Sequence, residues 1–219
     1  MTLAAIFDLD GTLVTFRFDV KGTREALLHE LEVRGLSTSG LGQGTPTQKI
    51  LEAARTQIPG ESDSEFEELR RVSYDILDKF ELASAPTTEP LPGAMETLDL
   101  LKSEKIRLAV LTNSGRKAAM EILGRSGLTG FFEFVLTRDE TETMKPRPEG
   151  IDKAISLLCL PKSDVWYVGD SPYDIMAAKQ AGIKVASVAT GNYTPKRLKE
   201  EGADRVMLSI TELPQVLGL

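Results

Sequence analysis

The sequence has little of what marks several large classes of protein. Cys159 is its only cysteine among 219 residues, so no disulfide can form within the chain, as is typical of a cytoplasmic protein. No apolar run approaches the roughly 20 residues of a membrane-spanning helix, and no basic segment precedes the first apolar run. We therefore expect neither a membrane anchor nor a signal peptide.

The sequence also lacks any block of Lys and Arg, and its net charge is −7. Both features argue against nucleic acid or an anionic membrane as the main partner. A small phosphorylated substrate stays possible, because it needs only a local positive site. The length suffices for one sizeable core and an accessory domain.

A long insertion separates the first two expected strands. Residues 3–7 and 107–112 are apolar runs that predict buried strands, and the gap between them far exceeds an ordinary crossover. We expect a helical cap of residues 15–88 here, with the Pro- and Thr-rich residues 85–90 as its return hinge. The catalytic core is then formed by residues 1–14 and 89–219.

Helical spacing of apolar residues predicts three helices in the cap. The first covers residues 20–34 and the second 46–58. The third begins at a capping-box pattern, Ser62 and Glu65. Its expected apolar stripe is Phe66, Leu69, Val72, Ile76 and Phe80.

From Leu91 onward, helices and strands alternate, which predicts an α/β fold: a doubly wound, Rossmann-like parallel sheet covered by helices on both faces. The expected helices cover residues 93–104, 116–126, 148–158, 172–181, 195–201 and 211–217, and the expected strands lie near 107–112, 132–136, 165–169, 184–188 and 204–207. In such sheets ligands bind at the carboxyl ends of strands, so functional residues should directly follow strands.

Two carboxylates follow the first strand. Because side chains alternate along a strand, Asp8 and Asp10 are expected to point the same way, and Gly11 lets the backbone turn. Side-by-side carboxylates at a buried strand end are costly unless something binds them. The alternative is a turn that is acidic by chance, since Asp-Gly is common in turns.

Polar residues follow two further expected strands. Thr112, Asn113 and Ser114 precede a helix, where a hydroxyl, an amide and free N–H groups make an anion site; plain N-capping is the alternative. Asp170 and Asp174 lie four residues apart across a helix start, so both can face one point.

Lys145 lies between the last two motifs, in Met144–Pro148. Prolines at 146 and 148 favour an extended setting for it, and a solvated surface charge is the alternative. Four carboxylates in one crevice would repel a phosphate, and Lys145 offsets only one of them. A divalent cation with oxygen ligands resolves this, and Mg²⁺ fits best.

These four ordered motifs resemble those of the haloacid dehalogenase superfamily of phosphohydrolases, and the insertion resembles that family's helical cap. The resemblance implies that Asp8 is the nucleophile and a Mg²⁺ ligand, and that Asp10 is the general acid/base with its carbonyl on the metal. It also implies that Thr112, Asn113 and Lys145 hold the phosphoryl group. Asp170 would ligate Mg²⁺, with Asp174 supporting it or Lys145.

Two departures bear on the substrate. The family's dehalogenases carry tyrosine where this chain has Asp10, which disfavours dehalogenation. Many relatives have Asp-Ser where this chain has Thr15-Phe16, which alters the entry into the cap. We expect a Mg²⁺-dependent phosphatase acting on a small metabolite such as a phosphoglycolate-like compound or sugar phosphate, as monomer or homodimer. A phosphomutase and a catalytically idle binding protein are the alternatives.

The remaining features have simpler interpretations. Gly40–Gly44 is expected to be a turn between cap helices that could project toward the active site. His29 is interpreted as a non-catalytic cap residue and Cys159 as a core residue. Trp166 and Tyr167 are expected to pack against helices from their strand.

Overall fold

The computed structural model describes residues 3–58 and 63–219. Six parallel strands form one sheet in the order β3-β2-β1-β4-β5-β6, which confirms the predicted fold class. The strands are β1 (Ala4–Phe7), β2 (Arg107–Leu111), β3 (Phe134–Leu136), β4 (Val165–Gly169), β5 (Lys184–Val188) and β6 (Arg205–Met207). The chain order reverses around β1, which pairs with both β2 and β4.

Helices cover both faces of this sheet. Successive side chains of a strand point to opposite faces, and the side chains on both faces are apolar. On one face, Phe7 and Val110 belong to a core with α4 (Ala94–Ser103), α5 (Arg116–Arg125) and α9 (Leu213–Leu217). On the other face, Ile6 and Ala109 belong to a core with α6 (Glu149–Leu158), α7 (Pro172–Ala181) and α8 (Pro195–Glu200). Short 3₁₀ turns at 85–87, 129–131, 162–164 and 210–212 complete the described elements.

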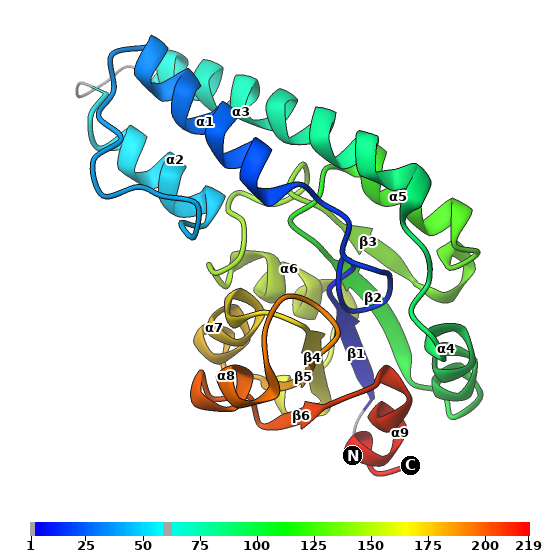
Figure 1. The fold of residues 1–219 in the computed structure, drawn as a ribbon. Coiled ribbons are helices and arrows are strands. Elements are labelled where there is room, and N and C mark those ends of the chain that lie inside the picture. Colours follow the sequence, from blue (N-terminus) through cyan, green and yellow to red (C-terminus); the bar gives the residue numbers. More distant parts are fainter. Residues whose placement is uncertain (1–2, 59–62) are drawn as a thin grey trace.

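Three helices interrupt the core between β1 and α4. They are α1 (Val20–Val33), α2 (Thr47–Arg55) and α3 (Asp63–Ser84), and Figure 1 shows them gathered at one end of the molecule, above the sheet. Outgoing and returning segments run side by side, since Thr15 N donates to Glu89 O at 2.8 Å and Leu91 N to Leu13 O at 2.9 Å. The domain boundaries at residues 15 and 88 stay a prediction.

The cap has a small core of its own, and the predicted stripe of α3 was right at Leu69 but wrong farther along the helix. Leu31, Ile50, Ala54, Ile58 and Leu69 form this core. On α3 the buried positions are Leu69, Ser73, Leu77 and Glu81, whereas Phe66, Val72, Ile76 and Phe80 are partly exposed. The buried line includes polar residues because the end of α3 packs on a charged group of the core. The predicted capping box at Ser62 lies outside the described residues.

One other expectation, that Cys159 is a core residue, was also wrong. Cys159 is exposed, because α6 ends at Leu158 and Cys159 takes a left-handed conformation with φ of 51°. Lys145 lies in a turn closed by Arg147 N, which donates to Met144 O at 3.0 Å, and the Lys145–Pro146 peptide bond in this turn is cis. Within residues 3–58 and 63–219, no helix combines the length and apolar character needed to cross a membrane.

Candidate active site

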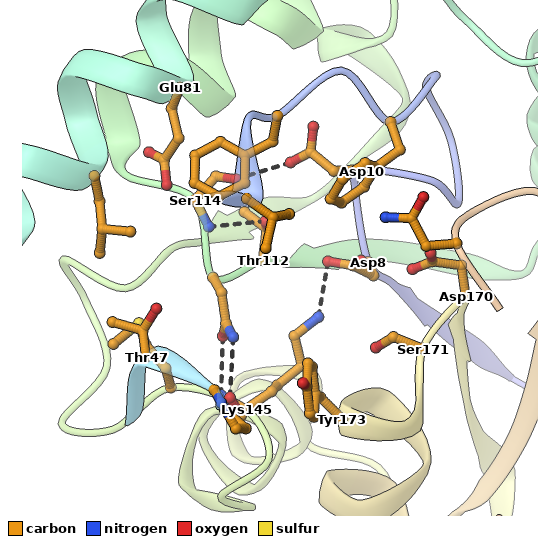
Figure 2. A pocket seen from close by; sticks show the side chains of 18 of the residues that line it. Asp8, Asp10, Thr47, Glu81, Thr112, Ser114, Lys145, Asp170, Ser171 and Tyr173 are labelled. Atoms are coloured by element: carbon orange, nitrogen blue, oxygen red, sulfur yellow. Dashed lines mark hydrogen bonds and ion pairs between the residues drawn. The ribbon is translucent and has the colours of Figure 1, made fainter. Parts of the chain in front are cut away.

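A cavity of about 240 Å³ lies between the carboxyl ends of the central strands and the cap. All predicted site residues except Asp174 line it: Asp8, Asp10, Thr112, Asn113, Lys145 and Asp170. Figure 2 shows that they converge from different segments of the chain. The cap contributes Gly44, whose carbonyl accepts a hydrogen bond from Tyr173 Oη at 3.1 Å, so the Gly40–Gly44 turn does approach the site.

Lys145 is buried at the centre of this site and not solvated at the surface. Its ammonium lies 2.7 Å from Asp8 Oδ1 and 2.6 Å from Asp174 Oδ1, and it donates to Tyr167 Oη at 2.8 Å. Burial alone would lower the pKa of Lys145, but the charges of Asp174 and Asp8 outweigh burial and hold that pKa well above its usual value. Lys145 therefore stays a cation between two carboxylates.

Asp8 and Asp10 line the same cavity, yet their carboxylates engage different partners. Asp8 pairs with Lys145, whereas Asp10 Oδ2 accepts a hydrogen bond from Ser114 Oγ at 2.8 Å. The expectation that both point the same way was wrong in this respect: β1 ends at Phe7, so strand alternation does not extend to Asp10. Figure 2 shows the Asp10 carboxylate directed toward Ser114, away from Asp8.

Burial changes the proton affinity of both carboxyl groups. It raises the pKa of Asp8 from its usual 3.8 to about 7, with Lys145 opposing the shift and Asp174 adding to it. Burial also raises the pKa of Asp10, against the hydrogen bond from Ser114 and the charge of Lys145. Two carboxyl groups in one cavity thus have separate environments, an arrangement suited to dividing two chemical tasks.

Asp170 and Asp174 are positioned by the start of α7. Pro172 is the first helical residue and Ser171 the N-cap, and Asp174 Oδ2 accepts hydrogen bonds from Ser171 N at 3.0 Å and Ser171 Oγ at 2.5 Å. The carboxylate of Asp170 accepts a hydrogen bond from its own backbone, which opposes the effect of burial on its pKa. Burial raises its pKa well above the usual value, and the charges of Asp174 and Asp8 raise it further.

These carboxylates form a group suited to a cation. Ligand oxygens of Asp8, Asp170 and Asp174 all lie within 4.8 Å of one another and are buried. A Cβ at Gly191 would lie 1.7 Å from Asp170 Oδ2, so only glycine leaves room for this carboxylate. Carboxylate oxygens are ligands that Mg²⁺ prefers, and one or two carboxylates usually hold the ion. The side chain of Asp10 is not part of this group.

Asn113 has a role that the sequence did not suggest. Its Oδ1 accepts a hydrogen bond from Lys145 N at 2.9 Å, and its Nδ2 donates one to Lys145 O at 3.0 Å. The side chain therefore holds the backbone that carries Lys145. Thr112 Oγ1 accepts from Ser114 N at 3.1 Å. The N-cap of α5 is Gly115, so the alternative of capping by Asn113 or Ser114 was wrong.

The expected anion site at the start of α5 is partly filled by the chain's own carboxylates. Gly115 N donates to Glu81 Oε2 at 2.9 Å, and Arg116 N donates to Asp139 Oδ2 at 2.7 Å. Arg138, fully buried, lies 2.6 Å from Glu81 Oε1 and also pairs with Asp78. This group joins the end of α3 to the core. Arg138 follows β3, a strand end where functional residues were expected, and that signal could have identified it.

Comparison with known proteins identifies the family of this chain. The family model described as haloacid dehalogenase-like hydrolase matches residues 5–188. A phosphoglycolate phosphatase from Neisseria meningitidis is 34% identical over 97% of this chain and 91% of its own length. Pyrophosphatase PpaX from Halalkalibacterium halodurans is 33% identical over 60% of this chain and 61% of its own length. The structure of a hydrolase from Pseudomonas syringae is 24% identical, with a TM-score of 0.70 over 99% of this chain and 98% of that one. The chain therefore belongs to the haloacid dehalogenase-like hydrolase family and is an enzyme of that family.

Proposed function

We propose that this chain is a Mg²⁺-dependent phosphatase that hydrolyses a small phosphorylated metabolite through an aspartyl-phosphate on Asp8. The observation that carries this proposal is that two carboxyl groups lining one cavity have different partners. Asp8 faces a cation at 2.7 Å, and Asp10 is held apart from it by Ser114. The names of the phosphatase relatives support the same reaction class.

In the first step an Asp8 oxygen attacks phosphorus and the bond from phosphorus to the ester oxygen breaks. Asp10 gives its proton to the departing oxygen, which its raised pKa favours, because burial stabilises the protonated form of this carboxyl group relative to the charged form. In the second step Asp10, now ionised, takes a proton from water. The water oxygen attacks phosphorus, and the bond from phosphorus to Asp8 breaks to release inorganic phosphate.

The other residues hold charges in place. Lys145 orients the Asp8 carboxylate and offsets negative charge on the transferring group, and Asn113 fixes the backbone of Lys145. Thr112 would contact the phosphoryl oxygens. Asp8 and Asp170, with the backbone carbonyl of Asp10, would hold Mg²⁺, while Asp174 holds Lys145. When bound, the ion supplies positive charge that stabilises the transferring phosphoryl group.

The substrate is proposed to be small. Cap residues, among them Gly44 and Thr47, line the cavity opposite the carboxylates, and its volume of about 240 Å³ suits a molecule of a few carbons. The name of the Neisseria relative points to 2-phosphoglycolate as the first compound to assay.

The test is trapping of the intermediate. Acid quenching during turnover of p-nitrophenyl phosphate with Mg²⁺ should leave a phosphoryl group on the peptide that contains Asp8, detected by mass spectrometry. Asp8→Asn should abolish the adduct and lower turnover by on the order of 10⁴ or more. Asp152→Asn, which changes an exposed carboxylate on α6, should have no effect. Near-normal turnover by Asp8→Asn would sink the proposal.

A further inference from the structure

A second buried cation faces the cavity, and the reaction proposed above does not use it. Arg24 on α1 lines the cavity together with Asp8 and Lys145, and only 8% of its surface is exposed. Its Nη1 donates to Thr47 Oγ1, on the cap side of the cavity in Figure 2. Its Nε is buried and has no hydrogen-bond partner among the described residues.

Arg24 lacks a negatively charged partner in the part of the chain that the structure describes. The titratable groups that act on it are the phenols of Tyr173 and Tyr193, a kind of group that is ordinarily neutral at pH 7. Burial lowers the pKa of Arg24, but a guanidinium remains charged in proteins. Taking such a charge out of water without pairing it is costly.

Arg138 shows how this protein treats an equally buried arginine that serves structure. That side chain is fully buried and forms ion pairs with two carboxylates, Glu81 and Asp78. Arg24 has no such pair among residues 3–58 and 63–219, although it is almost as buried. The difference is that Arg24 borders a cavity, so a ligand could supply the missing anion.

Lys145 cannot serve a second anion on the substrate, because Asp8 and Asp174 already lie within 2.7 Å of its ammonium. Among the described residues that line the cavity, Arg24 and Lys145 are the two with basic side chains. Arg24 is therefore the cation left for any negative group beyond the transferred phosphate. Its planar fork suits a carboxylate or phosphate, which it can bind through two parallel hydrogen bonds.

We propose that Arg24 determines specificity by binding a second anionic group on the substrate. Resting on the proposed phosphatase function, this narrows the substrate class to small phosphate esters or anhydrides with a carboxylate or a second phosphate near the scissile phosphate. The volume of about 240 Å³ limits the distance between the two charged groups to a few bonds.

The test compares substrates that differ in the second group. 2-Phosphoglycolate and pyrophosphate carry a second anion, whereas 2-hydroxyethyl phosphate and p-nitrophenyl phosphate do not. We expect Arg24→Gln to lower kcat/KM about 100-fold on the first two, mainly through KM, and less than about 3-fold on the others. The relative losses on 2-phosphoglycolate and pyrophosphate distinguish a carboxylate from a phosphate as the favoured group. Lys21→Gln, which removes an exposed positive charge from the same helix, should have the same small effect on kcat/KM for all four substrates.

Equal losses on all four substrates, or no loss on the first two, would overturn the proposal. If Arg24→Gln does not fold, competition in the unaltered protein decides. Phosphonoacetate should then inhibit hydrolysis of p-nitrophenyl phosphate at least 10-fold more strongly than ethylphosphonate, and equal inhibition refutes the role of Arg24. A protein that hydrolyses the aryl phosphate without preferring a second anion overturns this inference alone. Absence of any turnover would overturn the proposed function with it.

Discussion

Replacing Lys145 with methionine tests whether this ammonium neutralises the buried carboxylates. Methionine keeps the length and apolar stem of the side chain but removes its charge. The change leaves Asp8 and Asp174 without the cation that now lies 2.7 and 2.6 Å from them. Tyr167 Oη also loses a hydrogen bond of 2.8 Å.

The expected loss in the free energy of unfolding comes from the carboxylates that remain buried after the lysine is removed. Removing one partner of a buried ion pair typically costs about 3–5 kcal/mol, because the other charge stays buried without compensation. Against a total stability of roughly 5–15 kcal/mol, that is a large fraction. At about 2–4 °C per kcal/mol for a chain of this length, Tm should fall by roughly 6–20 °C.

The loss should depend on pH in a defined direction. The pKa of Asp8 already lies near 7 in the folded protein, above its usual 3.8, because of burial. Without Lys145 this pKa rises further, since the cation no longer favours the charged form. A carboxyl group with a raised folded-state pKa contributes stability that is complete below its usual pKa of 3.8 and is lost as the pH rises through the folded-state pKa. Lys145→Met should therefore be most destabilising at pH 8 and less so at pH 5.

Urea unfolding of the metal-free protein at pH 5 and pH 8 measures both effects. Lys196→Met removes a lysine whose side chain is 85% exposed and should be close to neutral at either pH. Adding Asp174→Asn to Lys145→Met should restore part of the stability, because one unpaired charge is removed. A loss below about 1 kcal/mol at pH 8, or an equal loss at both pH values, would refute the reasoning.

Three further predictions follow from the same groups. Asp10→Asn should slow hydrolysis of alkyl phosphates about 10²–10⁴-fold. It should slow hydrolysis of p-nitrophenyl phosphate much less, because a good leaving group needs no proton. Equal losses in kcat on the two kinds of substrate would show that Asp10 is not the acid. Binding of Mg²⁺ should release more protons at pH 6.5 than at pH 9, because the cation displaces the proton that the raised pKa of Asp8 retains at the lower pH. Calorimetry in buffers of different ionisation enthalpy measures this release, and heats independent of buffer at pH 6.5 contradict it. Arg138→Gln should lower the free energy of unfolding by about 3 kcal/mol, because it breaks the ion pairs with Glu81 and Asp78. Arg71, whose ion pair is exposed, supplies the control: Arg71→Gln should change the free energy of unfolding by less than about 1 kcal/mol.

The sheet and the location of the site could be predicted because both depend on local patterns. Apolar runs of strand length gave β1, β2 and β4, and polar residues directly after them gave Asp8, Thr112 and Asp170. Parallel strands bring their carboxyl ends to one edge of the sheet, so residues far apart in the sequence were expected to meet. No knowledge of their partners was needed for that step.

Predictions failed where a residue's environment is set by a distant segment. Glu81 is buried on α3 only because Arg138, 57 residues away, neutralises it, and an apolar stripe cannot reveal such a pair. Cys159 belongs to an apolar run, but the end of α6 at Leu158 turns it outward. In both cases the local composition favoured the wrong face.

The same limit applies to the chemistry of the first motif. From the sequence, Asp8 and Asp10 are two like residues on one strand end, and alternation predicted a shared direction. Their different surroundings come from Lys145, which lies between β3 and α6, and from Ser114, which follows β2. Because a carboxyl group's role depends on its surroundings more than on its identity, a nucleophile and an acid can be distinguished here only once those partners are placed. The distinction that the proposed mechanism needs is therefore a property of the assembled sheet edge, where a cation faces Asp8 and a hydroxyl faces Asp10.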